Sequence, residues 1–157
     1  MLQFHVGISL VGILSGLVVL YGLLVGEPFG VWTAIFLVTT ILTSLTGFPL
    51  EPYGFDPPRA VGVISLVLLA LAVAAYYAFG LAGAWRWIYV VSAVAALYLN
   101  VFVGVAQAFM KLPSLKALAP TQKEPPFVVT QGLVLLVFIA LGVWAVIRFH
   151  PEIGAGM

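Results

Sequence analysis

The sequence contains no cysteine and few charged residues. Lys and Arg number six and Asp and Glu five among 157 residues, so 7% of the chain is charged, against roughly 25% in soluble domains. The absence of cysteine excludes disulfides, thiolate catalysis, Cys-ligated zinc and iron–sulfur clusters. A formal net charge of +1, with no basic or acidic run, gives no indication of a nucleic-acid partner.

Ionisable side chains are also missing from the middle of every long apolar segment. Such groups are the usual marks of proton relays, ion pathways and voltage sensors, so the sequence disfavours a proton-coupled transporter or a pump for charged solutes. A neutral pore or facilitator is still compatible with it. No phosphate-binding loop, dinucleotide fingerprint, nucleophile elbow or metal-ligand spacing is present. We therefore predict no catalytic, cofactor-binding or metal-binding residue.

The residues that are present are mostly apolar. Hydrophobic residues make up 64% of the chain and its mean hydropathy is +1.23. A spanning helix needs about 20 apolar residues, and five stretches qualify, over residues 4–25, 31–48, 60–79, 87–110 and 127–149. The first is too long for the apolar region of a signal peptide and is interpreted as a retained helix. We predict an all-α integral membrane bundle, a single transmembrane domain over residues 1–157. It has five spans, or four if the connector "GLAGAWR" does not reach the surface.

Five spans place the two termini on opposite sides of the membrane. The N-terminal side then holds four basic residues and the opposite side two, which favours a cytoplasmic N-terminus. Four aromatic residues lie near predicted helix ends on the opposite side, as in an interfacial aromatic belt. The basic residues are Arg59, Lys111, Lys116 and Lys123 against Arg86 and Arg148, and the aromatic residues are Trp32, Trp85, Trp87 and Tyr89.

Two proline pairs mark predicted helix starts. Pro57 and Pro58 precede the third apolar stretch, and Pro125 and Pro126 precede the fifth. Proline suits the first turn of a helix because the amide hydrogen it lacks would be unpaired there. Asp56 directly precedes the first pair and is placed to cap that helix.

Small residues share one face of the first predicted helix. This face contains Gly12-x-x-x-Gly16 and Gly22-x-x-x-Gly26, a spacing that lets two backbones approach closely in lipid. Gly104 lies on a similar narrow stripe of the fourth helix. We therefore expect these five glycines to be helix-packing positions.

Hydroxyl groups share one face of the second predicted helix. Thr33, Thr39, Thr40, Thr43, Ser44 and Thr46 fall within one arc at helical spacing, and apolar residues that include Leu37 fill the other side. One interpretation is a packing face, since threonine also bonds its own helix. The other is a polar vestibule in the cytoplasmic half of the bundle, which would hold a head group or a small neutral solute. The residues of that polar cluster would be Ser9, Thr43, Ser44, Asn100, Gln107 and Gln131.

The two histidines and the few carboxylates give weaker hypotheses. Five spans put His5 and His150 at opposite membrane faces, where they cannot ligate one haem, whereas four spans would put them at the same face. An enzyme acting on lipid head groups through Glu51, Asp56 or His5 lacks a visibly assembled acid–base pair. The simpler interpretation of the Glu51–Arg59 segment is a turn-rich loop at the membrane surface.

A resemblance to a known family rests on four segments, "FHVGISLVGILSGLVVLYGLL", "WTAIFLVTTILTSLTGF", "AWRWIYVVSAVAALYLNVFV" and "ALAPTQKEPPF". Through them the chain resembles a family of small bacterial multi-pass inner-membrane proteins to which no function is assigned. The resemblance implies a bacterial inner (cytoplasmic) membrane location and carries over no functional residue. We expect a non-enzymatic accessory or scaffold subunit that uses a Gly or Thr face to dock on partner transmembrane helices. The alternative is a protein that binds or transports lipid, quinone or a small neutral solute. Expected partners are membrane lipids and a protein partner or further copies of the chain.

Overall fold

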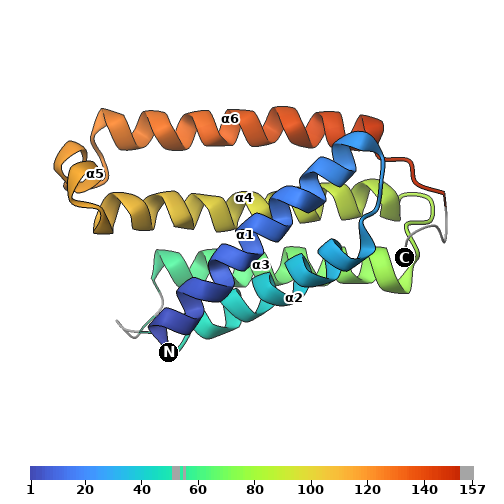
Figure 1. Cartoon of the computed structure of the whole chain (residues 1–157), viewed down its shortest axis with the longest axis horizontal. Coiled ribbons are helices and arrows are strands. Elements are labelled where there is room, and N and C mark those ends of the chain that lie inside the picture. The colour runs from blue at the N-terminus through green and yellow to red at the C-terminus, as the bar shows by residue number, and fades with distance from the viewer. Residues whose placement is uncertain (51–53, 55, 153–157) are drawn as a thin grey trace.

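The computed structural model of the chain is a bundle of helices (Figure 1). It describes residues 1–50, 54 and 56–152. Five helices in this part of the chain are long and apolar enough to cross a membrane, which confirms the prediction of a five-span all-α bundle. The elements are α1 (Leu2–Val25), α2 (Gly30–Gly47), α3 (Pro57–Val73) with a π-helical extension η1 (Ala74–Ala78), α4 (Trp85–Lys111), α5 (Pro113–Leu118) and α6 (Pro125–Arg148).

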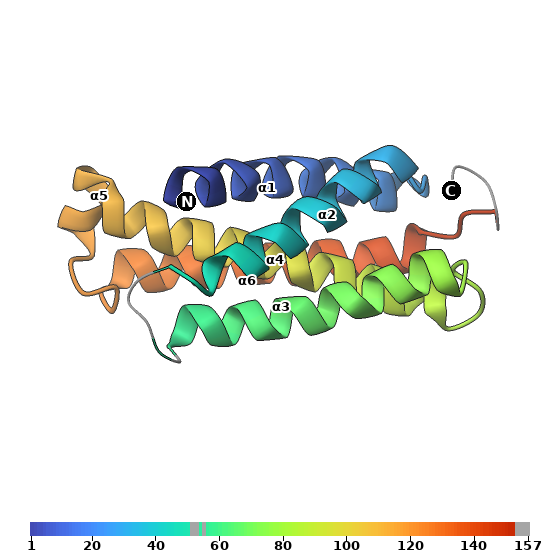
Figure 2. The same ribbon diagram turned by 90° about the horizontal axis from the view of Figure 1, so that it is seen from below.

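The helix α4 is the centre of the bundle. It contacts α1, α3, η1, α5 and α6. Figures 1 and 2 show α6, α4 and α3 in a row, with the α1–α2 hairpin crossing one face of that row. The N-terminus, the α2–α3 connector and α5 lie at one end of the bundle, here called the N-terminal side. The α1–α2 turn, the α3–α4 turn and the end of α6 lie at the other, the C-terminal side.

The helices begin and end where the local sequence signals predict. Asp56 is the N-cap of α3, and its carboxylate accepts a hydrogen bond from the Arg59 amide at 3.1 Å. The proline pairs occupy the first turns of α3 and α6. α1 ends at Gly26, whose φ of 84° is the left-handed conformation that glycine adopts without a steric penalty. These results confirm the predicted helix entries to within a few residues.

The α3–α4 connector reaches the C-terminal side. Gly80 and Gly83 have positive φ values of 55°, and the chain reverses between Phe79 and Trp85. The final turn of the preceding helix is widened to a π-helix, which hydrophobic periodicity alone does not indicate. The connector therefore separates two spans, and the four-span alternative does not apply.

Many of the fully buried core residues lie near the C-terminal side. Ala72, Ala75 and Ala96 are fully buried and let the helices approach each other. Tyr89 is also fully buried, with its ring 5.1 Å from that of Tyr76, so its expected place in an interfacial belt is wrong. Its helix presents it to the bundle interior, whereas two tryptophans of the expected belt, Trp32 and Trp87, are 45% and 48% exposed.

Two arginines fasten helix ends at opposite sides of the bundle. Arg59 donates to the carbonyl oxygens of Phe48 at 3.0 Å and Leu50 at 2.6 Å, and it forms an ion pair with Asp56. Arg86 donates to the carbonyl oxygens of Val146 at 2.8 Å and Phe149 at 2.9 Å. The last carbonyls of a helix have no donor within the helix and carry partial negative charge. Arg59 therefore ties the end of α2 to α3, and Arg86 ties the end of α6 to α4.

The Arg86 contact predicts a specific loss of stability. Arg86→Gln removes two charge-assisted hydrogen bonds, so we expect the free energy of unfolding in detergent to fall by about 2 kcal/mol. Arg148→Gln is the control, since this arginine lies on the same side with an exposed side chain. Equal unfolding midpoints for the two variants would contradict the proposed role.

Candidate functional site

The glycines at the start of the α1 stripe lie inside the bundle. A Cβ atom at Gly16 would lie 2.5 Å from Leu97 Cδ1 of α4 and 2.9 Å from Phe36 Cδ2 of α2. At Gly12 it would lie 3.1 Å from Thr40 Oγ1. This face of α1 is therefore filled by α2 and α4, and it is not free to dock a partner helix.

The other three expected packing glycines have different surroundings. A Cβ atom at Gly22 would lie 2.7 Å from the carbonyl oxygen of Glu27, within the α1–α2 turn. Gly26 ends α1, as described above. Gly104 faces Ile13 of α1, with 3.4 Å from its Cβ position to Ile13 Cδ1. The second Gly-x-x-x-Gly pair thus builds a turn, because the chain reverses directly after it.

Two residues of the hydroxyl face of α2, Thr33 and Thr40, are buried and point into the bundle. Thr39 and Thr43 are half-buried, and their hydroxyls donate to carbonyls one turn earlier in their own helix, at 2.6 and 2.8 Å. Leu37, expected on the lipid side, is buried with 2% exposure. The inward face of α2 is therefore wider than its hydroxyl arc, because α2 packs against both α1 and α3.

The expected polar cluster is divided between different interfaces. Asn100 lies at the junction of α1, α2 and α4, with its Nδ2 atom 3.2 Å from the Cβ position of Gly12. Gln131 of α6 instead donates to the carbonyl oxygen of Phe102 at 3.0 Å. Ser9 donates to the carbonyl oxygen of His5 within α1 at 2.7 Å.

Ser44 lies on the part of α2 that faces α3, since its carbonyl oxygen is 3.9 Å from the Cβ position of Gly62. Gln107 is half-buried on α4, toward the N-terminal side. These contacts place Asn100, Gln131 and Ser44 at three different interfaces. Both cavities described below have apolar linings.

One small polar junction does form in the middle of the membrane-spanning region. Thr40 Oγ1, Thr39 Oγ1 and Asn100 Nδ2 all lie 3.1–3.3 Å from the Cβ position of Gly12. Thr40 Oγ1 and Asn100 Nδ2 are buried and have no hydrogen-bond partner among the described residues. An unpaired polar atom in an apolar region costs free energy, so this junction lowers the stability of the bundle unless a further group pairs with it.

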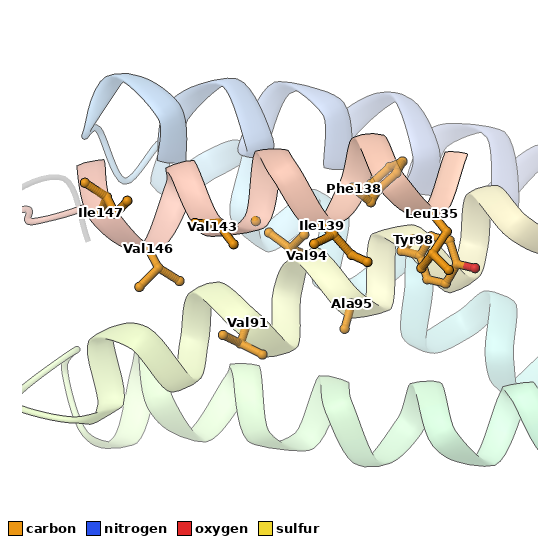
Figure 3. A pocket seen from close by; sticks show the side chains of 11 residues that line it. Val91, Val94, Ala95, Tyr98, Leu135, Phe138, Ile139, Val143, Val146 and Ile147 are labelled. Atoms are coloured by element: carbon orange, nitrogen blue, oxygen red, sulfur yellow. The ribbon is translucent and has the colours of Figure 1, made fainter. Parts of the chain in front are cut away.

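An apolar groove lies between α4 and α6 on the side away from α2 (Figure 3). Its volume is about 460 Å³. Leu135 to Ile147 of α6 form one wall, which is about 18 Å long at 1.5 Å per residue. The α4–α6 groove is lined by Val91, Val94, Ala95, Tyr98, Leu135, Phe138, Ile139, Gly142, Val143, Val146 and Ile147.

A second apolar cavity, of about 300 Å³, lies between α3 and α4 and shares Val91 with the first. The outer face of α4 is therefore the floor of two adjacent hollows, with α6 on one side and α3 on the other. Sequence reasoning missed both, because a groove depends on which helices are neighbours. Hydrophobic periodicity does not specify that.

The residues of the haem and enzyme hypotheses lie apart. His5 is hydrogen-bonded through Nδ1 to Thr46 Oγ1 at 2.9 Å on the N-terminal side, and His150 follows α6 on the C-terminal side. Asp56 caps α3 and pairs with Arg59. Glu51 lies outside the described residues. Among the described residues, no group of three His, Cys, Asp or Glu side chains could hold a metal ion.

No protein-family model, curated protein or solved structure matches this chain.

The glycine geometry predicts opposite outcomes for two substitutions in α1. Gly16→Leu forces a side chain against Leu97 and Phe36, so we expect the free energy of unfolding to fall by about 2–3 kcal/mol. Gly7→Leu is the matched control, since nothing lies within 4 Å of its Cβ position. That variant should be neutral or more stable by up to about 1 kcal/mol, because leucine favours the helix over glycine. An equal loss of unfolding free energy in the two variants would refute the close approach of α2 and α4 to α1 at Gly16.

The polar junction predicts that Thr40→Val is tolerated. If Thr40 Oγ1 is unpaired, its removal should leave the free energy of unfolding unchanged or raise it by about 1 kcal/mol. Thr33→Val is the control, because Thr33 Oγ1 donates to the carbonyl oxygen of Pro28 at 3.0 Å, and its loss should cost about 1 kcal/mol. A destabilising Thr40→Val would instead show that a water molecule or another group pairs with this hydroxyl.

Proposed function

We propose that this chain is a non-enzymatic accessory subunit whose α4–α6 groove receives a transmembrane helix of a partner protein. The observation that carries this proposal is the groove itself. It is long, apolar and open on the lipid-facing side of the central helix. Transmembrane helices associate by close van der Waals packing, which small residues in the contact favour. Ala95 and Gly142 supply such positions in the lining.

The low coverage of α6 supports the same proposal. Over an apolar stretch of 18 residues, only 11% of the residues of α6 are buried, against 39% over stretches of the same length in α1 and in α4. α6 contacts the rest of the bundle through α4 and α1. The packing faces expected from the sequence, around Gly12, Gly16 and Thr40, are occupied within the bundle. A partner helix would therefore use the groove.

We further propose a bacterial cytoplasmic membrane with the N-terminus in the cytoplasm. The exposed lysines Lys111, Lys116 and Lys123 lie on the N-terminal side. On the opposite side, the guanidinium of Arg86 is engaged with backbone carbonyls, and Arg148 is exposed. This distribution agrees with the positive-inside rule.

The second candidate function is binding of a lipid or quinone tail in the same groove. Its volume of about 460 Å³ falls within the range of roughly 300–1,000 Å³ that is typical of small-molecule sites. An apolar lining suits an acyl or isoprenoid chain. The candidate site for this function is thus the groove rather than the polar residues expected from the sequence.

Cross-linking from single cysteines would test the groove, since the native chain has none. Ile139→Cys places a thiol in the groove. Leu14→Cys places one on the outer surface of α1, where Leu14 is 64% exposed. In source membranes we expect Ile139→Cys to cross-link one partner protein at fixed stoichiometry, and Leu14→Cys to give no such product. Adding Ala95→Trp should fill the groove and abolish the cross-link.

Equal, unspecific cross-linking from both cysteines would contradict a docked helix. In that case native mass spectrometry of the purified chain separates the two functions. A discrete small mass bound to the wild type and lost with Ala95→Trp would favour the lipid or quinone tail. A protein without partner or bound mass would refute both.

A further inference from the structure

The connector between α4 and α6 combines basic and apolar side chains on an exposed surface. Lys111, Lys116 and Lys123 are all exposed. Leu112, which directly precedes α5, and Leu118, its last residue, are 51% and 55% exposed. This set of three lysines and two leucines is here called the α5 surface. It projects from the N-terminal side of the bundle (Figures 1 and 2).

The α5 surface is held close to the membrane-spanning helices. Gln122 Nε2 donates to the carbonyl oxygen of Ala106 at 2.8 Å, five residues before the end of α4. Ala119 is buried at 1% exposure, and the Phe109 and Phe127 rings meet edge to face at 5.4 Å. At 1.5 Å per residue, Ala106 lies about 7–8 Å inside the end of α4. The connector thus folds back to the depth of the helix ends, where lipid head groups lie.

The charge of the connector is positive. Between residues 111 and 124 the sequence has three lysines and one acidic residue, Glu124. The Glu124 carboxylate accepts hydrogen bonds from the Thr121 hydroxyl at 2.7 Å and from the Lys123 amide at 3.0 Å. These bonds lower the pKa of Glu124. Its carboxylate is therefore held within the turn, and the three exposed lysines form no ion pair with any of the described residues.

We propose that the α5 surface binds the head groups of anionic phospholipids in the leaflet on the N-terminal side. Lysines near a membrane surface attract anionic lipid, and each contributes roughly 1 kcal/mol, about fivefold in affinity. The exposed leucines beside them suit the boundary between head groups and acyl chains. A soluble acidic partner would match the charges but would leave Leu112 and Leu118 in water, so the bilayer is the occupant that matches both features.

This surface is separate from the α4–α6 groove. The groove begins at Leu135 on α6 and Tyr98 on α4, and it shares no residue with the connector. Variants of the α5 surface therefore leave the groove intact. Failure of one proposal leaves the other standing.

The test is a lipid-retention measurement on the purified full-length chain. The protein is placed in nanodiscs of equal parts phosphatidylglycerol and phosphatidylcholine, extracted mildly, and examined by native mass spectrometry. We expect the wild type to retain phosphatidylglycerol preferentially. Lys116→Gln combined with Lys123→Gln should reduce that preference at least tenfold, and Leu118→Ser should reduce it less.

Arg148→Gln, on the opposite side, should leave the preference unchanged, and the unfolding midpoint of each variant should match the wild type. The proposal is overturned if the wild type retains both lipids equally, or if Arg148→Gln reduces retention as much as the lysine variants do. It is also overturned if millimolar inorganic phosphate displaces phosphatidylglycerol fully, since the surface would then be a site for free anions.

Discussion

Hydrogen bonds from side chains to backbone carbonyl oxygens of other segments make up a large part of the polar chemistry of this bundle. In lipid no water replaces a missing donor, and each unpaired group costs several kcal/mol. The chain carries few polar side chains, and four of the long ones are used for this purpose. Arg59, Arg86, Gln122 and Gln131 each donate to a carbonyl oxygen of a different segment. The same bonds that satisfy the backbone therefore also decide which helices are neighbours.

Close approach of backbones supplies the remaining attraction. Gly16 leaves no room for a side chain between α1, α2 and α4, and the buried residues of α3 and α4 include the small Ala72, Ala93 and Ala96. This mode of packing is consistent with membrane helices, which gain no hydrophobic effect from contact with each other. It also concentrates the tight contacts in one part of the molecule. α6 is held along one side only, and the open groove is the result.

The sequence predicts the spans well because hydropathy and helix-end signals are local properties. The apolar stretches, the proline pairs and the Asp56 cap all lie where expected. Neighbour relations are not local, and the errors arise there. Leu37 and Tyr89 are buried because of the helices beside them, and the second glycine pair serves a turn. The polar cluster was expected because its residues lie at a similar depth in the membrane. Depth does not determine how each helix is rotated about its own axis, and Asn100 and Gln131 face different neighbouring helices. The α4–α6 groove required the three-dimensional arrangement.

The bond between Arg86 and the end of α6 has a consequence for biosynthesis. The arginine and the first carbonyl it binds are 60 residues apart in the chain, and α6 is made after α4. α4 must therefore enter the membrane with its guanidinium served by water or lipid phosphate at the interface. Only when α6 has crossed can the arginine exchange these temporary partners for Val146 and Phe149. Closure of the bundle on its C-terminal side is thus a late event of assembly, and the groove beside α6 comes into existence with it.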